Sequence, residues 1–343
     1  MCAFQGRMGH GADAPRKAAA YRWTRAFAIA ITALCATAAH AQDAFPTKPI
    51  RVVVPFAVGS ANDLIPRLLA PRLSQRLGQP VVVENQTGGG GLVATEAVIK
   101  SAPDGHTLLV GTSSGMVMNL ALYRKLPYEI DKRLTGAGLI ARTTLALVAN
   151  PNTPGATLQE MLAYARANPG KITYGSGGNG SISHIVPEYF RRLTGIEIQH
   201  VPYRGNGPAL IDVIGGQIHL LFDSPQNGVQ LMAKGAVKVY AVGGEQRHPI
   251  LPGVPTFIES GVKDFDPYTW NCFMAPSGTP APVLEKLNRE MNAVLAEPEI
   301  AASLDKMGAQ RIGGRNLEGT NAFIAAERAR WVPLVRSLNV TLD

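Results

Sequence analysis

Short loops of small polar residues recur through this sequence, and each joins a strand-like run to a helix-like run. The loops stand at 57–62, 86–91, 111–115 and 175–181, and Gly, Ser, Thr and Asn are frequent in them. Strands that alternate with helices through such loops build a parallel sheet with helices on its faces. The sequence therefore predicts an α/β fold.

The expected elements form two such sets, followed by a strand and a helical tail. Apolar, β-branched runs predict strands at 50–56, 81–85, 106–110, 145–149, 172–174, 196–201, 218–222, 237–242 and 270–274. Helix signals include the capping box from Thr157 to Glu160, the stop at Gly195, and Thr279 as the cap before Pro280. No low-complexity linker separates the sets, so we expect two doubly wound domains joined by crossing strands.

The N-terminal segment is typical of a secretory signal peptide. Basic residues precede the apolar run 26–38, which is too short to span a bilayer, and Ala39-His40-Ala41 fits the small-x-small cleavage pattern. We expect residues 1–41 to be removed and the protein to work in the periplasm. Their loss lowers the formal net charge from +8 to +4, because they carry five basic side chains and one acidic one.

Composition excludes several classes of function. The sequence has no long run of Lys and Arg interleaved with aromatic residues, so we do not expect it to bind nucleic acid. Cys272 is the one cysteine after the expected cleavage site, so no internal disulfide is expected. The histidines show no metal-ligand spacing, and we expect neither a metal nor a cofactor.

The four glycines Gly88, Gly89, Gly90 and Gly91 follow a strand and precede a helix. Backbone without side chains can approach a ligand closely, and the unpaired N–H groups of a helix start attract anions. A flexible turn with no ligand is the alternative. Ligands of open α/β sheets bind at the carboxyl ends of strands. The four small polar loops together therefore favour an anion site over plain turns.

Three further side chains are candidates because they follow expected strands. Arg204 could pair with a carboxylate in a bidentate manner, or form a salt bridge to a neighbour such as Asp212. Asp223 could cap the following turn or accept a hydrogen bond from a ligand. His184, in the first turns of a helix, could bind a ligand, cap the helix or serve packing.

A hydrolase is the enzymatic alternative. Gly111 to Gly115 satisfies G-x-S-x-G after a strand, and Ser113, Asp223 and His248 follow one another in the order of a hydrolase triad. His248 lies in a polar loop with no evident strand to hold it. This weakens the hydrolase hypothesis.

The chain resembles the substrate-binding proteins of tripartite tricarboxylate transporters, the Bug (TctC-like) family of periplasmic receptors. The matching stretches include 54–63, 77–85, 103–109, 174–184, 200–205, 251–256 and 275–280. The resemblance implies a type II periplasmic-binding-protein fold with a cleft between two α/β domains. The first domain would comprise 42–143 plus 268–343, and the second, inserted domain 144–267.

The resemblance also implies a binding protein that catalyses no reaction. Such receptors bind small organic carboxylates through backbone N–H groups and bridging waters, and pass them to a membrane permease pair. We expect a monomer. The alternative is a receptor that passes its signal to a periplasmic sensor instead of delivering its ligand to a transporter. The chain departs from the family where Val58-Gly59-Ser60 replaces Pro-Gly-Gly, and where Gln86-Thr87 replaces Arg-Pro before the glycines.

The expected ligand-binding residues share positions in the loops after strands. They are Phe56, Ser60, Gly88, Gly89, Gly90, Gly91, Thr112, Ser113, Ser176, Ser181, His184, Arg204 and Asp223.

Overall fold

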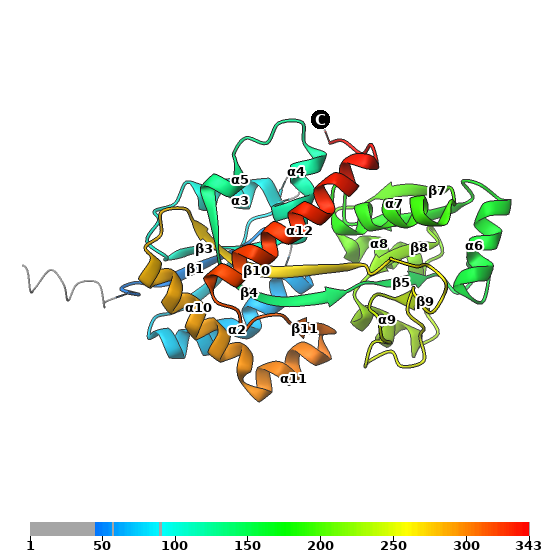
Figure 1. The fold of residues 1–343 in the computed structure, drawn as a ribbon. Coiled ribbons are helices and arrows are strands. Elements are labelled where there is room, and N and C mark those ends of the chain that lie inside the picture. Colours follow the sequence, from blue (N-terminus) through cyan, green and yellow to red (C-terminus); the bar gives the residue numbers. More distant parts are fainter. Residues whose placement is uncertain (1–44, 57, 89–90, 343) are drawn as a thin grey trace, which may run out of the picture. The chain divides into compact units, whose positions relative to one another are not determined.

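The computed structural model describes residues 45–56, 58–88 and 91–342. From Lys48 onward the chain forms one compact unit, which contains two sheets and their helices (Figure 1). The expected signal peptide, residues 1–41, lies outside the described residues.

The first sheet is mixed, in the strand order β11-β4-β10-β3-β1-β2. Its parallel part comprises β1 (Ile50–Val54), β2 (Val81–Asn85) and β3 (Thr107–Thr112). Its antiparallel part comprises β4 (Leu134–Thr144), β10 (Tyr268–Pro276) and β11 (Ala309–Arg311). The strand–loop–helix pattern thus correctly predicted the parallel strands, and the later chain completes the sheet.

The helices of this part of the chain are α2 (Ala61–Leu77), α3 (Leu92–Ile99), η3 (Ser114–Met118), α4 (Asn119–Leu122), α5 (Ile130–Arg133), α10 (Ala281–Ala296), α11 (Pro298–Lys306) and α12 (Leu317–Ser337). Of these, η3 is a π-helix that directly follows β3.

The second sheet has the order β7-β6-β8-β5-β9. Its strands are β5 (Ala146–Ala149), β6 (Ile172–Ser176), β7 (Ile198–Pro202), β8 (Leu220–Asp223) and β9 (Lys238–Val242). β6 is parallel to β7 and β8, whereas β5 is antiparallel to β8 and β9. The accompanying helices are α6 (Leu158–Ala167), α7 (Ile182–Thr194), α8 (Asn206–Ile214) and α9 (Pro225–Met232).

The long strand β4 is absent from the sequence-based expectations, and its glycines explain why. Gly136 and Gly138 interrupt its apolar pattern. A Cβ at Gly136 would lie 2.7 Å from the Thr320 Cγ2 atom, and one at Gly138 would overlap the end of the Met291 side chain. A side chain at Gly136 would clash with α12, and one at Gly138 would force the Met291 side chain of α10 to move, so the two glycines let both helices pack closely on the strand.

The helix-end predictions are correct at two places and wrong at one. The Thr157 hydroxyl accepts a hydrogen bond from the Glu160 N–H at 3.2 Å and begins α6, and Gly195 ends α7 in the left-handed conformation. At α10 the cap is Pro280. The Thr279 hydroxyl instead donates to the Pro276 carbonyl, so it does not cap the helix.

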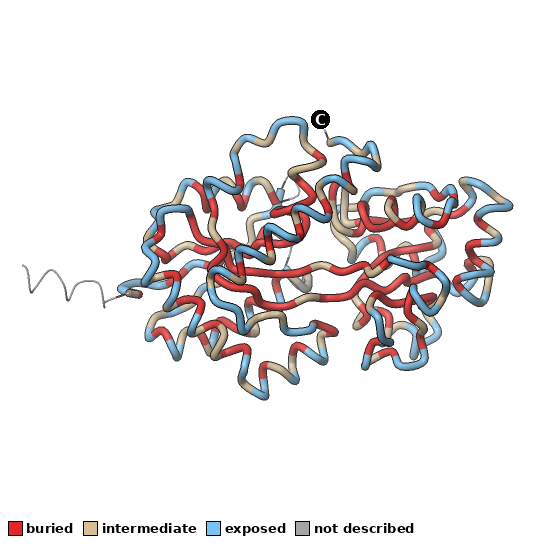
Figure 2. The backbone as a smooth tube through the Cα atoms, in the orientation of Figure 1, coloured by how far each residue is buried: buried red, intermediate tan, exposed pale blue. Residues whose placement is uncertain are grey.

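Helix α12 is attached to strand β10 by a buried carboxylate. Glu327 accepts hydrogen bonds from the Tyr268 hydroxyl at 2.6 Å and the Trp270 indole N–H at 2.8 Å, and all three residues are buried. Figure 2 shows the buried run of the long central strands. Both donors are shielded from water. Loss of the Glu327 carboxylate would therefore leave two buried donors without an acceptor, which costs more stability than the loss of one exposed hydrogen bond.

The chain passes between the two sheets twice: at residues 143–146, where β4 runs into β5, and at residues 267–269, where Pro267 leads into β10. We call these two stretches together the crossing segment. Leu145 lies between β4 and β5; its N–H donates to the Pro267 carbonyl at 2.9 Å, and its carbonyl accepts from the Gly243 N–H at 2.8 Å. These backbone bonds join the two sheets through extended chain, as expected for crossing strands.

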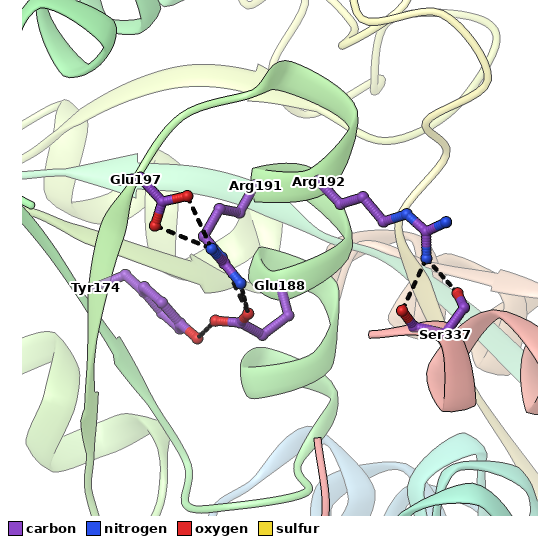
Figure 3. A network of polar contacts seen from close by, with 6 residues as sticks. All are labelled: Tyr174, Glu188, Arg191, Arg192, Glu197 and Ser337. Carbon is purple, nitrogen blue, oxygen red and sulfur yellow. Dashed lines mark hydrogen bonds and ion pairs between the residues drawn. The ribbon is translucent and has the colours of Figure 1, made fainter. Parts of the chain in front are cut away.

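Helix α12 makes a second connection, because it also contacts α7 of the second sheet. The Tyr189 ring meets Trp331 edge to face at 6.0 Å, and the Arg192 guanidinium donates to the Ser337 carbonyl at 3.0 Å (Figure 3). The C-terminal helix therefore contacts elements of both sheets.

Replacing Glu327 with Ala should destabilise the fold, because the Tyr268 and Trp270 donors would stay buried without an acceptor. We expect a loss of about 2–5 kcal/mol in the free energy of unfolding, measured by urea denaturation. The control is Glu285→Ala on the exposed face of α10, which should change it by less than about 0.5 kcal/mol. Equal effects of the two substitutions would contradict this role of Glu327.

Candidate functional site

A cavity of about 420 Å³ is lined by residues from both sheets. One group, the first wall, follows β1 and β3 and comprises Phe56, Val58, Gly59, Ser60, Asn62, Leu64, Ile65 and Ser114. The second wall follows β6, β7 and β8 and includes Ser181, Ile182, Ser183, residues 204–208, Asp223 and Asn227. Thr143, Leu145 and Thr269 of the crossing segment complete it, with Met307. The cavity thus lies at the carboxyl ends of strands, where α/β proteins bind ligands.

The shape of the first wall depends on the buried carboxylate of Asp63. It accepts hydrogen bonds from the Gly59 N–H at 2.9 Å, the Asn85 amide at 2.8 Å and the Arg67 guanidinium at 2.9 Å. The Asn85 amide also donates to the Phe56 carbonyl at 2.9 Å. Burial acts to raise the pKa of Asp63, but these donors outweigh it and hold the pKa below its usual value.

A chain of hydrogen bonds organises the second wall. The Ser183 hydroxyl accepts from the Gly177 N–H at 2.9 Å and donates to the Asn206 amide oxygen at 2.8 Å. The Asn206 amide N–H donates to Asp223 at 3.1 Å, and Asn227 donates to the other Asp223 oxygen at 2.8 Å. Each side chain therefore holds its neighbour in orientation, which preorganises the wall for a ligand.

Asp223 and Arg204 are the charged residues of the described lining. Burial raises the pKa of the Asp223 carboxyl, although Asn227, Asn206 and the Ser224 N–H oppose this. Arg204 is exposed, and its guanidinium forms no hydrogen bond or ion pair with another described residue. The alternative of a salt bridge to Asp212 is wrong, because no ion pair of the described residues joins Arg204 to Asp212, which accepts from the Tyr203 hydroxyl at 2.6 Å.

Much of the remaining lining is apolar. Phe56, Ile65, Leu145, Ile182 and Met307 contribute hydrocarbon or sulfur to the walls. The combination of apolar walls and a few oriented polar groups is the usual composition of a small-molecule site.

Five of the sequence-predicted residues line the cavity: Phe56, Ser60, Ser181, Arg204 and Asp223. Thr112, Ser113, Ser176 and His184 are buried and do not line it. Gly88 and Gly91 also lie outside the lining, and Gly89 and Gly90 are outside the described residues.

Several predicted residues that do not line the cavity support the residues that do. The Ser113 hydroxyl is hydrogen-bonded to the Thr269 hydroxyl at 2.8 Å, and Thr269 itself lines the cavity. The Thr112 hydroxyl accepts from the Gly115 N–H at 3.3 Å. Gly91 begins α3 with a positive φ, and a Cβ there would lie 3.3 Å from the Pro55 Cβ atom. Its place is thus explained by backbone conformation and close packing.

His184 belongs to a stack of buried rings behind the second wall. Its Nδ1 accepts from the Gly180 N–H at 3.1 Å, and its ring stacks on His200 at 4.0 Å, which stacks on Tyr174 at 4.9 Å. Burial lowers the pKa of His184, and burial together with His184 lowers that of His200 to about 4. The stack is therefore neutral at neutral pH. The capping and packing alternatives for His184 are the ones its contacts match.

The ring stack rests on an ionic network, shown in Figure 3. The Tyr174 hydroxyl donates to Glu188 at 2.6 Å, and Arg191 pairs with both Glu188 and Glu197 at 3.0 Å. Ser176 also contacts the stack, with its hydroxyl 2.6 Å from the His200 Nε2 atom. Ser176 thus belongs to the support of the cavity loops.

The sequence-based prediction missed several polar residues of the lining. They are Asn62, Ser114, Thr143, Ser183, Asn206, Ser224, Gln226, Asn227 and Thr269. Ser114, Ser183 and Asn206 stand one or two residues from predicted positions, so a wider reading of the same loops would have included them. Thr143 and Thr269 lie within strands, where composition carries no such signal.

The geometry does not support the hydrolase alternative. Ser113 has ordinary right-handed helical φ and ψ rather than the strained turn of a nucleophile elbow. His248 interacts with the Gly308 carbonyl and the Ile250 N–H, and Asp223 with Asn206 and Asn227. The three residues of the hypothesised triad therefore have separate partners.

No group of three or more His, Cys, Asp or Glu residues in the described part of the chain could hold a metal ion. In the same part of the chain, no helix combines the length and apolar character that crossing a membrane requires.

Comparison with known proteins identifies the family. Residues 65–340 match the family model for the tripartite tricarboxylate transporter family receptor, TctC. The chain belongs to this family. Protein BugT of Bordetella pertussis (strain Tohama I) is 34% identical over 301 residues, which cover 88% of this chain and 92% of BugT.

Solved structures of relatives agree with the two-sheet architecture. R. palustris Rpa4515 with adipate matches with a TM-score of 0.81 at 32% identity, over 87% of this chain and 99% of that one. The periplasmic binding protein BugD matches with a TM-score of 0.79 at 32% identity and the same coverage. The fold is therefore that of a periplasmic binding protein, with two α/β domains, and the protein is a receptor of the TctC/Bug family.

Asp63→Asn should destabilise the protein in a pH-dependent manner, because the amide cannot accept from all three donors. The pKa of Asp63 is lower in the folded state, so its contribution is complete well above pH 4 and is lost as the pH falls through the folded-state pKa. We expect a loss of about 1–3 kcal/mol at pH 7, which shrinks below about pH 4, by urea denaturation.

The control for this prediction is Asp264→Asn. Asp264 is exposed and has a positive φ, a conformation that asparagine also adopts. Its substitution should have little effect at either pH. A difference for Asp63→Asn that does not change with pH would contradict the proposed role of its charge.

Proposed function

We propose that this receptor captures a small organic carboxylate in the cavity and delivers it to the membrane permease pair of a tripartite tricarboxylate-type transporter. The observation that carries the proposal is the Arg204 guanidinium, which lines the cavity without a partner among the described residues. A guanidinium binds a carboxylate through two parallel hydrogen bonds.

Neighbouring groups support an anion beside Arg204. The second wall contributes the Ser181 hydroxyl and the Gly205 and Gly207 backbone, and the first wall contributes Ser60 and the Gly59 backbone. Hydroxyls, backbone N–H groups and bridging waters accommodate carboxylates of varied shape. The relative Rpa4515 was solved with a dicarboxylate, adipate.

Domain movement is part of the proposal. We propose that the domains are 42–143 plus 268–343 and 144–267, and that ligand binding closes them around the cavity by bending at the crossing segment. The exposed apolar side chain of Val58, on the first wall, would then be covered. The mature receptor would begin at Gln42, act in the periplasm as a monomer, and need no cofactor.

Replacing Arg204 with Ala should weaken the binding of organic carboxylates by about 10- to 100-fold, since a charge-assisted hydrogen bond to an ionised group is lost. Isothermal titration calorimetry would measure this, after a thermal-shift screen of organic acids identifies ligands that raise the Tm with concentration.

The control variant is Arg133→Ala, which removes the same charge from an exposed position outside the lining. It should leave the affinity within about twofold, because long-range attraction is screened by salt. If no carboxylate raises the Tm while a sugar or a metal cation does, the proposed function is wrong.

A further inference from the structure

The charges of the cavity are balanced but do not neutralise each other directly. The described lining contains one basic residue, Arg204, and one acidic residue, Asp223. No ion pair joins them or joins either to another residue of the described chain. A ligand with a single negative charge would match Arg204 and leave the Asp223 side of the cavity unmatched.

The groups that face Asp223 are neutral donors. They are the Asn206 amide at 3.1 Å from α8, the Asn227 amide at 2.8 Å from α9, and the backbone N–H of Ser224. On the sheet side, Asp223 pairs with Ala146 of β5. A carboxylate offers about four acceptor positions, so three donors leave room for one more.

The two charged groups flank the same part of the wall. The Asn206 amide donates to Asp223, and Arg204 precedes Asn206 by two residues, which limits the Cα separation of Arg204 and Asn206 to about 7 Å. Arg204 is exposed, whereas Asp223 is buried. The cavity therefore has its positive group near solvent and its acidic group at depth.

We propose that the ligand class is a zwitterionic monocarboxylate: an amino acid whose carboxylate binds Arg204 and whose ammonium group binds Asp223, with its hydrocarbon part against the apolar first wall. This inference rests on the proposed function, because it assumes that the cavity binds a carboxylate. An ammonium group supplies both the missing donor and the opposite charge that a buried carboxylate requires.

The inference excludes simple dicarboxylates as the preferred ligands. A second carboxylate at depth would meet Asp223, and two like charges at contact disfavour binding unless one of them takes up a proton. Asp223 thus acts as the specificity-determining residue between amino acids and dicarboxylates.

The test compares matched pairs of ligands that differ only in the amino group: leucine against 4-methylpentanoate, and phenylalanine against 3-phenylpropanoate, with adipate as the dicarboxylate. Titration calorimetry on the mature wild-type protein should show the amino acid of at least one pair bound about tenfold or more tightly than its partner without the amine, and more tightly than adipate.

Asp223→Asn keeps the shape and the position of the side chain but removes its charge. We expect it to weaken amino-acid binding by about tenfold more than it weakens binding of the matched acid without the amine, because both ligands share any change in the hydrogen bonds of Asn206 and Asn227. Wild-type affinity for the amino acid should fall as the pH drops through the pKa of Asp223, and the variant should lack this dependence. Asp212→Asn, in helix α8 outside the cavity lining and hydrogen-bonded by the Tyr203 hydroxyl, is the control and should change neither affinity.

The outcomes separate the inference from the proposed function. Carboxylates that bind with no preference for the amine, or amino-acid binding unchanged in Asp223→Asn, would overturn the inference and leave the carboxylate receptor standing. Failure of every carboxylate, with or without an amine, to bind the wild-type protein would overturn the proposed function itself.

Discussion

The cavity depends on the antiparallel pairing of β4 with β10. This ladder runs from Leu134 opposite Pro276 to Thr144 opposite Tyr268, and its last rungs lead directly into the second sheet. Thr143 and Thr269 are partners in the ladder and both line the cavity. The same hydrogen bonds that complete the first sheet therefore place the crossing segment beside the ligand site. The proposed closure of the domains around a ligand would bend this segment, which itself lines the cavity.

Helix α12 adds a constraint on that movement. Glu327 attaches it to β10, while Trp331 and Ser337 contact Tyr189 and Arg192 of α7. Helix α7 begins at Ile182, which lines the cavity together with Ser181 and Ser183. The position of the second wall is thus linked through α7 to the C-terminal helix. The buried rings and the ion pairs of Glu188 and Arg191 stiffen α7, so a movement at its first turn is carried along the helix.

Sequence patterns predicted the fold better than they predicted the site. Strand–loop–helix alternation is a local property, and it placed β1, β2, β3 and β6 correctly. Strand β4 was missed because Gly136 and Gly138 interrupt its apolar pattern. These glycines allow close packing against α12 and α10, and local composition gives no information about such tertiary contacts. The family resemblance was needed to recognise a receptor.

Whether a predicted site residue lines the cavity depends on the direction of its side chain. Successive residues of a strand point to opposite faces, so the residue at its end can face the cavity or the core. Asp223 lines the cavity, whereas Ser176 turns to His200 behind it. Gly88 and Gly91, the most conspicuous feature of the sequence, lie outside the lining. Arg204 was predicted with two alternatives, and only the tertiary structure shows that Asp212 is already occupied by Tyr203.

We propose that the cavity lined by residues from both sheets binds the carboxylate of a small organic acid. A crystal structure of the mature protein with the acid that most raises its Tm tests this most directly. We expect the carboxylate within hydrogen-bonding distance of the Arg204 guanidinium, and the rest of the ligand between Phe56 and Asn206. A ligand bound elsewhere, or one whose carboxylate points away from Arg204, would contradict the account.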